Sequence, residues 1–521
     1  MMLVKNMFQI LIAANILGLL YLVFYPLPHH DNKPHPYGLP GNQIQKRLWQ
    51  NVHGLGHAHN ISGWNAKHHL NDTYRGMKLH PIGVKAPSYK ANSKSMRQVP
   101  LYTNISQICV NLSLASTESG FVNFIRDIRR RNIAPDDEFL RLTENCTEFR
   151  SLRAYHSNAL SSEEAEFPVA YGIYIYRSAH QVEQLLRSIY MPHNYYCLHV
   201  DRKSPKLLHD AIRAIGQCFN NVFVIPDPSV IVYRSIGLLH AEMKCLELLS
   251  KKGRWKYYIN LSGQEYPLRT NLEIVRSLNA LDGKNDVSSI PNVVPYRQEF
   301  VHVIENGVLV KTDETRSSIP PANISLYYGE AHVILSRDFV DFVLTDEKAG
   351  ILLSWLKGSD TPEEHFYSTL NRLPQAPGGE TRDSMSMARA KMWDDGTSDR
   401  SGNIRCHGKY IHDICILTTA DLPWLLRQPF LFANKFHVTY DPLVIDCLQE
   451  IIGHRSLHDS PVDVKIYSEY RHTPSIGNCL DVNDVSFNPN SLFRITRCAL
   501  EYANSHFPNI MEQMMKYSRH L

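Results

Sequence analysis

The chain has 521 residues, of which 43% are hydrophobic and 20% are charged, so it can bury one large core or two medium ones. Its 55 basic and 51 acidic side chains give a net charge of +4 and are spread without a long run of one sign. This composition excludes mostly disordered and fibrous proteins, and the balanced charge argues against nucleic acid as a partner, because clustered Lys and Arg would then be expected.

An apolar stretch follows Lys5 and ends before Pro26, close to the length of about 20 residues that a membrane span needs. A cleaved signal peptide is the alternative, but the stretch is long for one and no small-residue cleavage site follows it. We therefore expect a cytosolic tail over residues 1–6 and a transmembrane anchor over 7–25, with the rest of the chain in the lumen. Residues 26–108 are rich in Pro, His, Asn and Gly with little periodicity, which predicts a luminal stem.

Seven Asn-x-Ser/Thr sequons and ten cysteines fit a luminal location. Asn260 lies in an apolar run where a glycan would not fit. We expect glycosylation at the other sequons, which are Asn60, Asn71, Asn104, Asn111, Asn145 and Asn323. The cysteines include no C-x-x-C pair of the zinc-ribbon or thioredoxin type, so in an oxidising lumen we interpret them as disulfides rather than metal ligands.

From Phe167 onward, β-rich runs alternate with segments of helical periodicity. Strands are predicted at 167–176, 194–201, 221–227 and 256–263, and helices at 179–190, 205–219 and 236–253. This alternation is typical of a mostly parallel sheet with helices on both faces. Ligands bind such sheets outside the carboxyl ends of the strands, where Asp201 and a predicted turn at 262–268 fall.

Several nucleotide and hydrolase motifs do not occur in the sequence. It lacks the phosphate loop of P-loop kinases and sulfotransferases, the GxGxxG of dinucleotide dehydrogenases and the GxSxG elbow of hydrolases. An anchored luminal α/β protein suggests glycosyl transfer, because sugar nucleotides are the common donors there, although this step rests on association alone.

Two adjacent carboxylates, Glu363 and Glu364, follow Pro362 where a helix is predicted to begin. A structural role accounts for both of them. Thr361 would be the N-cap, Pro362 suits the first helical position, and Glu364 stands where a capping box places its glutamate. On the residues alone, this capping role and a catalytic role both remain open.

Four segments together resemble the core 2/I-branching β-1,6-N-acetylglucosaminyltransferases, whose relatives include the peptide O-xylosyltransferases. They are FPVAYGIYIYRSAHQVEQLLRSIYMPHNYYCLHVDRKSP, YYINLSGQEYPLRTNLEIVRSL, TPEEHFYSTLNRLP and DICILTTADLPWLLRQPFLFANKF. The resemblance predicts a catalytic domain over residues 109–456 and leaves 457–521 as a C-terminal extension. It implies an α/β, GT-A-like nucleotide-sugar transferase fold with a mostly parallel central sheet flanked by helices.

The resemblance implies an inverting, metal-independent enzyme that moves GlcNAc from UDP-GlcNAc to a hydroxyl of an O-glycan such as core 1, forming a β-1,6 branch. No cofactor is expected, and the sequence has no Asp-x-Asp triplet, on which many GT-A enzymes hold manganese. The implied partners are UDP-GlcNAc, an O-glycan or glycoprotein acceptor and the Golgi membrane, spanned once in the type II orientation, with a homodimer as one option. Two alternatives stay open: a protein O-xylosyltransferase using UDP-xylose, and a non-catalytic Golgi glycan-binding protein with the same fold.

Carried over by position, Glu364 matches the family's general base, which takes a proton from the acceptor hydroxyl. Lys435 matches a lysine that binds the diphosphate of the donor, and His412 stands where the family has an arginine for the same purpose. Because a histidine is charged only when protonated, three nearby cations are candidates to replace it: Lys409, Arg405 and Arg427.

Three further positions have both a family role and a structural alternative. Asp201 matches a residue at the nucleoside end of the donor site, or is a turn residue after a strand. Arg297 aligns with an arginine that contacts the acceptor sugar, or is a surface residue. Trp393 falls near an acceptor-stacking tryptophan, or belongs to the core. Ser288 stands where the family has a glutamate that holds the acceptor, so this chain departs from the family at that position.

The resemblance also implies disulfides, which the sequence alone would leave open among many pairings. They are Cys109–Cys447, Cys146–Cys218, Cys197–Cys245 and Cys406–Cys415. The two cysteines that remain, Cys479 and Cys498, lie in the tail, and we expect them to pair with each other.

Overall fold

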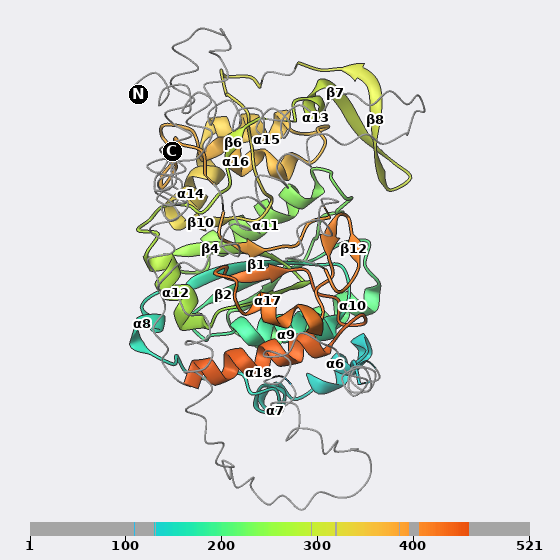
Figure 1. Cartoon of the computed structure of the whole chain (residues 1–521), viewed down its shortest axis with the longest axis vertical. Helices are drawn as coiled ribbons and strands as arrows, with labels where there is room; N and C mark the ends of the chain where they lie inside the picture. The colour runs from blue at the N-terminus through green and yellow to red at the C-terminus, as the bar shows by residue number, and fades with distance from the viewer. Residues whose placement is uncertain are drawn as a thin grey trace, which may run out of the picture. The chain divides into compact units, whose positions relative to one another are not determined.

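The computed structural model describes residues 109, 130, 132–292, 294–317, 320–384, 386–394 and 406–457, all within one compact unit. Its central sheet has five strands in the order β10-β4-β1-β2-β3 (Figure 1). The four parallel strands are β1 (Val169–Ile175), β2 (Tyr195–Val200), β3 (Val222–Val224) and β4 (Tyr257–Ser262). The edge strand β10 (Ile334–Ser336) runs antiparallel to β4. The predicted strands are confirmed, and so is the predicted fold class, a mostly parallel central sheet flanked by helices.

Helices connect the parallel strands as the sequence predicts. They are α9 (Ala179–Ile189), α10 (Lys206–Gln217) and α11 (Gly237–Ser250). Ser178 is the N-cap of α9, and its hydroxyl accepts a hydrogen bond from the Gln181 amide at 3.2 Å. Further helices cover the sheet: α12 (Asn271–Asn279), α14 (Arg337–Thr345), α15 (Glu347–Trp355), α16 (Phe366–Leu370) and α18 (Leu443–Leu457).

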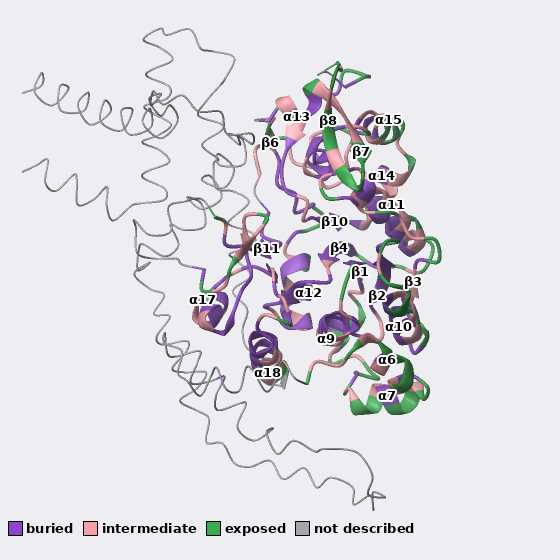
Figure 2. Ribbon diagram, turned by 90° about the vertical axis from the view of Figure 1, so that its right-hand side faces the viewer, coloured by how far each residue is buried: buried purple, intermediate pink, exposed green. Residues whose placement is uncertain are grey.

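Two hydrophobic cores lie on opposite faces of the sheet, because successive side chains of a strand point to opposite sides. In β1, Tyr171 and Ile173 belong to the core that includes α9, α10, α12 and α18. Ala170 and Tyr174 belong to the core that includes α11, α14, α15 and α16. All seven residues of β1 are buried, and the sheet is purple between its helices in Figure 2. This arrangement explains why the strand reads as a continuous apolar run.

A second, three-stranded sheet lies next to the carboxyl end of β4 and has the order β11-β14-β5. Its strands are β5 (Glu265–Pro267), β11 (Arg389–Ala390) and β14 (Phe432–Asn434). The prediction of a simple turn at 262–268 is therefore wrong, because residues 265–267 pair with β14. The segment turns after β4 and then forms an edge strand whose partner lies far along the chain.

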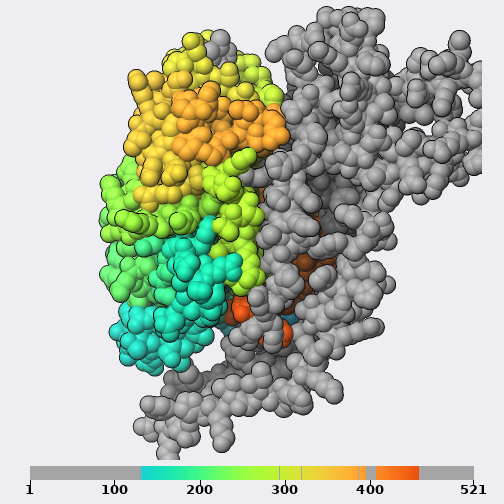
Figure 3. All heavy atoms as spheres, turned by 90° about the vertical axis from the view of Figure 1, so that its left-hand side faces the viewer, coloured from blue at the N-terminus to red at the C-terminus, as the bar shows by residue number. Residues whose placement is uncertain are grey.

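Shorter elements surround these sheets. They are α6 (Asp136–Leu142), α7 (Cys146–Leu152), α8 (Ser162–Ala165), β6 (Ile290–Pro291), α13 (Tyr296–Glu299), β7 (Phe300–Glu305), β8 (Val308–Thr315), β9 (Tyr327–Tyr328), η1 (Pro362–Glu364), β12 (Tyr410–Ile411), β13 (Ile414–Cys415), η2 (Thr419–Asp421) and α17 (Leu422–Leu425). The β7–β8 hairpin carries exposed residues, drawn green in Figure 2. On the face seen in Figure 3, yellow and orange residues that include α14 lie above the green and cyan residues of the sheet region.

Four disulfides tie these elements together, with the pairing that the resemblance implies: Cys109–Cys447, Cys146–Cys218, Cys197–Cys245 and Cys406–Cys415. Asn260 is buried in β4, as expected for an unmodified sequon, whereas Asn145 and Asn323 are exposed.

Several predictions fall outside the described residues. They concern the cytosolic tail, the anchor, the stem, nearly all of the C-terminal extension, Cys479, Cys498 and the sequons at Asn60, Asn71, Asn104 and Asn111. Within the described part of the chain, no helix combines the length and apolar character that a membrane crossing requires.

Candidate active site

Glu364 ends the short 3-10 helix η1, which leads into α16. The predicted capping box is not formed. Thr361 has a left-handed backbone with φ of 51° and makes no side-chain cap, because its hydroxyl donates instead to Asp360 at 2.8 Å. Asp360 is in turn held by Arg234, with 2.7 Å between Nε and Oδ1. The carboxylate of Glu364 is thus positioned by a braced turn and not by the cap of a regular helix.

Arg297 holds the Glu364 side chain directly. Its Nη1 donates to Oε2 of Glu364 at 2.6 Å, and the guanidinium lies 5.4 Å from the ring centre of Tyr328. The Arg297 side chain is 3% exposed, so the surface-residue alternative is wrong, whereas Glu364 is 21% exposed. Burial opposes the charge of Arg297, but the Glu364 carboxylate outweighs it and raises the arginine pKa. The arginine therefore keeps its charge beside the Glu364 carboxyl group.

A neutral histidine supports this arrangement. His365 Nδ1 donates to the carbonyl of Tyr327 at 3.0 Å, which leaves Nε2 to accept from the Gln298 amide at 2.8 Å. Burial, followed by the positive charge of Arg297, lowers the pKa of His365 to about 3. The neutral ring thus links α13, which carries Arg297, to the turn that carries Glu364.

Glu363 differs sharply from its neighbour. Its side chain is buried, and Oε2 has no hydrogen-bond partner. Burial is the main cause that raises the pKa of Glu363 to about 8, and the negative charge of Glu364 adds to it. Near neutral pH, Glu363 is therefore mainly a neutral carboxylic acid.

On the other side of the site, Lys435 directly follows β14. Its Nζ donates to the carbonyl of Ile411 at 2.7 Å. Burial, followed by the charge of Arg177, lowers the pKa of Lys435 to about 8. The ammonium group is charged at neutral pH, but its surroundings favour loss of the proton more than water does.

His412 and Asp413 form the two-residue turn of the β12–β13 hairpin, with φ of 50° and 61°. Two positive φ values match the turn that joins closely paired strands, and the Cys406–Cys415 disulfide closes this segment. The His412 ring stacks on Tyr233 at 4.2 Å between centroids. Burial and the charge of Lys435 lower the pKa of His412, so it is mainly neutral at pH 7.

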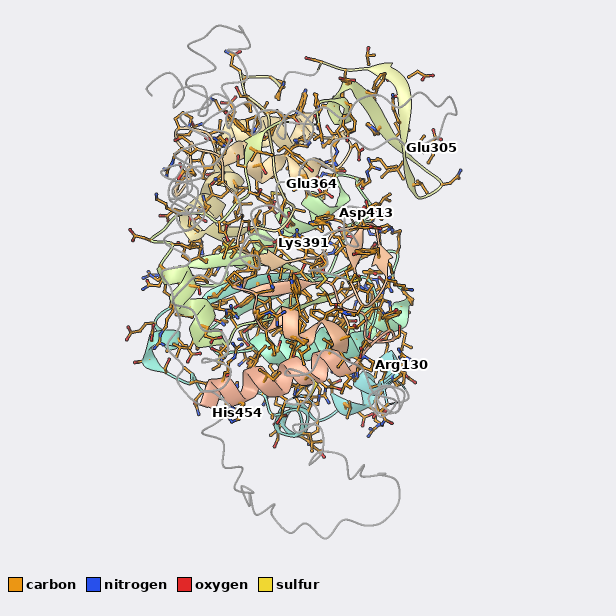
Figure 4. The ribbon with its side chains drawn as sticks, viewed as in Figure 1. Arg130, Glu305, Glu364, Lys391, Asp413 and His454 are labelled. Atoms are coloured by element: carbon orange, nitrogen blue, oxygen red, sulfur yellow. A yellow bond between two sulfur atoms is a disulfide. The ribbon has the colours of Figure 1, made fainter. Side chains whose placement is uncertain are left out.

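Tyr233 connects the two sides of the site. It is 61% exposed, stacks on His412, and precedes Arg234, the partner of Asp360 in the Glu364 turn. Glu364 and Asp413 both act electrostatically on its hydroxyl. Figure 4 shows Glu364 and Asp413 in the region between the central sheet and the helices above it.

Asp201 follows β2 at the same edge of the sheet. Its Oδ1 accepts from the amides of Lys203 at 3.0 Å and Ile231 at 3.3 Å. The structural alternative is therefore realised, because the carboxylate closes the turn after the strand. Residue 201 also lies beside the end of β1, since Ile175 and Val200 are paired.

Trp393 forms a β-bridge with Ile414, and Nζ of Lys391 lies 5.3 Å from the centre of its ring. Lys391 is buried and bonds Glu330 at 2.7 Å and His332 at 3.2 Å. His332 also contacts Glu265 in β5, which pairs with Arg389 in β11. These contacts join Lys391 to the second sheet. Lys391 lies close to the sheet in Figure 4. Ser288 lies two residues before β6, and its buried hydroxyl has no hydrogen-bond partner among the described residues.

Sequence reasoning missed several residues of this site: Arg177, Tyr233, Arg234, Asp360 and Lys391. Arg177 carries the clearest signal, because it comes directly after the β-rich run that became β1. Three cations were candidates to replace the arginine that the family has at the position of His412. One of them, Lys409, acts electrostatically on His437, which lies near Lys435. Arg427 is exposed at the end of α17, and Arg405 lies outside the described residues.

Comparisons with known proteins identify the family of this chain. Residues 169–426 match the Core-2/I-Branching enzyme family. An N-acetyllactosaminide beta-1,6-N-acetylglucosaminyl-transferase of Homo sapiens is 39% identical over 342 residues, which cover 64% of this chain and 84% of the relative. A human beta-1,3-galactosyl-O-glycosyl-glycoprotein beta-1,6-N-acetylglucosaminyltransferase is 36% identical, with coverages of 63% and 79%. The parallel-rich sheet is consistent with a GT-A-like domain, and the chain belongs to the Core-2/I-branching enzyme family of glycosyltransferases.

Proposed function

We propose that this protein is an inverting, metal-independent β-1,6-N-acetylglucosaminyltransferase that uses UDP-GlcNAc and acts on an O-glycan such as core 1. The names of its relatives support GlcNAc transfer to a glycan. The observation that carries the proposal is the Glu364 carboxylate, which is accessible to solvent and oriented by the buried Arg297 at 2.6 Å. Such a carboxylate is suited to act as a general base.

In the proposed reaction, the acceptor hydroxyl oxygen forms a bond to C1 of GlcNAc while the bond from C1 to the β-phosphate oxygen breaks. The hydroxyl proton passes to Glu364, and UDP leaves from the opposite face of the sugar. Inversion at C1 follows from this single displacement. Arg297 acts as a positioning residue, because it contacts Glu364 and is too buried to be a free base or acid itself.

The departing diphosphate gains negative charge, and the proposal assigns its stabilisation to protein cations instead of a metal ion. Lys435 supplies one such cation at the carboxyl end of β14. Its lowered pKa supports this role, since an ammonium group in partly dry surroundings gains more from a bound anion than one in water.

The test measures UDP release by the full chain in EDTA. Donors are UDP-GlcNAc and UDP-xylose, and acceptors are core 1, N-acetyllactosamine and serine-containing peptides. We expect turnover with UDP-GlcNAc and a glycan, and a loss of about a hundredfold or more in kcat for Glu364→Gln. Glu363→Gln is the matched control, because it changes an adjacent carboxyl group that is already mainly neutral.

Other outcomes would overturn parts of the proposal. Turnover only with UDP-xylose and a peptide would indicate an O-xylosyltransferase. Activity that EDTA abolishes and manganese restores would contradict metal independence. Acceptor binding without UDP release from any pair would indicate a glycan-binding protein with this fold.

We also propose that the protein is a type II Golgi membrane protein, anchored by residues 7–25 with residues 26–521 in the lumen. The apolar stretch after Lys5 and the four disulfides support this topology, since disulfides persist in oxidising compartments. Alkaline carbonate extraction and protease protection of sealed vesicles test it. Release by carbonate, or digestion without detergent, would contradict it.

A further inference from the structure

A group of positive side chains lies at the carboxyl edge of the central sheet, beside the proposed donor site. Arg177 follows β1 and is exposed, and Lys435 follows β14. The Arg177 guanidinium hydrogen-bonds Nε2 of His437, 260 residues further along the chain. Since His437 is two residues after Lys435, the fold brings two cations from distant segments to one place.

Other contacts hold these two segments together. The Gln181 side chain in α9 donates to the carbonyl of Phe436 at 3.0 Å and accepts from the amide of Val438 at 3.1 Å. It therefore fixes both sides of His437. This link fixes the segment after β14 against the loop after β1, so the position of Arg177 relative to Lys435 does not depend on the contact of Arg177 itself.

The loop after β1 is also fixed from the sheet side. The Tyr176 hydroxyl donates to Gln264 at 2.9 Å, and the carbonyl of Gln264 accepts from the Phe436 amide at 2.7 Å. The Arg177 guanidinium carbon lies 4.1 Å from the centre of the Tyr176 ring. The arginine is thus supported by a stacked ring that is itself hydrogen-bonded to the turn after β4.

Asp413 is the carboxylate that acts electrostatically on Lys435. Neither Arg177 nor Lys435, however, forms an ion pair with an acidic side chain of the described residues; their side chains contact His437 and the Ile411 carbonyl. They lie close enough for Arg177 to lower the pKa of Lys435 and, after burial, that of His437. Like charges brought together in a partly buried site are unfavourable unless an anion binds between them.

We propose that Arg177 is a donor-binding residue that acts with Lys435 on the diphosphate of the nucleotide sugar. The inference rests on the proposed function for the identity of the donor. His412 is less suited to this role, because it forms the tip of a tight turn, stacks on Tyr233 and is mainly neutral. The guanidinium of Arg177 keeps its charge at all relevant pH values and can bind two phosphate oxygens at once.

The test measures binding of UDP and of uridine to the full chain by calorimetry, for wild type, Arg177→Gln and Arg177→Lys. We expect Arg177→Gln to weaken UDP binding about tenfold to a hundredfold, as for the loss of a charge-assisted hydrogen bond, and to leave uridine binding unchanged. Arg177→Lys should recover part of the loss. A merely structural role would affect both ligands alike.

Arg213→Gln is the matched control, because Arg213 is an exposed arginine that pairs with Asp210 on α10. It should leave both affinities unchanged. Unchanged UDP binding by Arg177→Gln, or an equal loss of UDP and uridine binding, would overturn the inference. Thermal unfolding of each variant shows whether the fold is intact.

Failure of this inference is distinguishable from failure of the proposed function. If wild type turns over UDP-GlcNAc but Arg177→Gln keeps its UDP affinity and its KM for the donor, the inference fails and the function stands. If wild type binds UDP through Arg177 without any turnover, the inference stands and the transferase proposal fails. If wild type binds no UDP, both fail.

Discussion

Glu363 and Glu364 are neighbours in the sequence, yet the fold gives their side chains very different surroundings. Glu364 is partly exposed and paired with Arg297, whereas Glu363 is buried with an unpartnered oxygen. Burial raises the pKa of Glu363 to about 8, so this carboxyl group is mainly neutral near pH 7. Glu363 therefore contributes an uncharged side chain to this turn, which makes Glu363→Gln a suitable control for Glu364→Gln.

The raised pKa of Glu363 predicts an effect on stability. Above its ordinary value of 4.5, the unfolded chain releases this proton, while the folded chain keeps it up to about pH 8. The free energy of unfolding should therefore fall as pH rises through this window. In Glu363→Gln this fall should be smaller, and activity at pH 7 should stay close to wild type. Urea unfolding from pH 5 to 9 measures it, and equal pH dependence in both proteins would contradict it.

The lowered pKa of Lys435 predicts how donor binding depends on pH. Below about pH 8 the ammonium is charged and binds phosphate, and above it the charge is lost. The neighbours His412 and His437 have lowered pKa values and stay neutral there. The Kd for UDP should rise above pH 8, toward tenfold per pH unit.

Calorimetry of UDP binding between pH 7 and 9.5 tests this dependence. Lys435→Arg keeps its charge throughout and should show a much flatter profile. A wild-type Kd that does not change up to pH 9.5 would show that the charge of Lys435 is not used.

Individual residues were predictable only where their role depends on local sequence. Asp201 follows a strand and closes a turn, which its position alone allows. The burial of Arg297 was not predictable, because its partner Glu364 is 67 residues away. The prediction of a capping role for Thr361 was wrong for a similar reason. The Thr361 hydroxyl donates a hydrogen bond to Asp360, which is itself held by Arg234 from a distant loop.

Among the elements, the end of β9 lies very close to the turn that carries Glu364, and the contact is made by Gly329, the residue directly after this strand. A Cβ added to Gly329 would lie 1.8 Å from the carbonyl oxygen of Ser288 and 2.3 Å from the Ser368 hydroxyl. The Gly329 amide also donates to the carbonyl of Glu364 at 2.8 Å. Glycine is thus required here for close approach, and a larger residue would displace the turn.

Gly329→Ala should therefore lower the free energy of unfolding by about 1–3 kcal/mol, as overpacking does. It should also reduce kcat, because Glu364 moves. Gly350→Ala in α15 is the control: nothing lies within 4 Å of its added Cβ, and alanine should stabilise this helix by about 0.5–1 kcal/mol. Equal stabilities of the two variants in urea unfolding would contradict the close approach.

The alternation of strands and helices could be predicted because each central element has its own periodicity. The apolar run of β1 and the helical spacing of α9 are complete signals within one segment. The second sheet could not be predicted in this way. Its strands β5, β11 and β14 have two or three residues each, and only their pairing across the chain defines them.

At the scale of the whole molecule, disulfides join segments over very different lengths of chain. Cys109–Cys447 spans 338 residues, whereas Cys406–Cys415 spans nine. If disulfides act mainly by restricting the unfolded chain, replacing the first pair by serine should cost roughly twice as much stability as replacing the second. Urea unfolding of the two double variants measures this. An equal or smaller loss for the long loop would point to effects in the folded state.

Strand β1 also determines where the chain can change in length. Because its alternate side chains belong to different cores, the insertion or deletion of one residue would move each set of side chains to the opposite core. The exposed Tyr176 and Arg177, just beyond the strand, contribute to neither core. Substitutions in this loop can therefore change the charge beside Lys435 without changing either core, so the charge at this edge and the folding of the sheet can evolve separately.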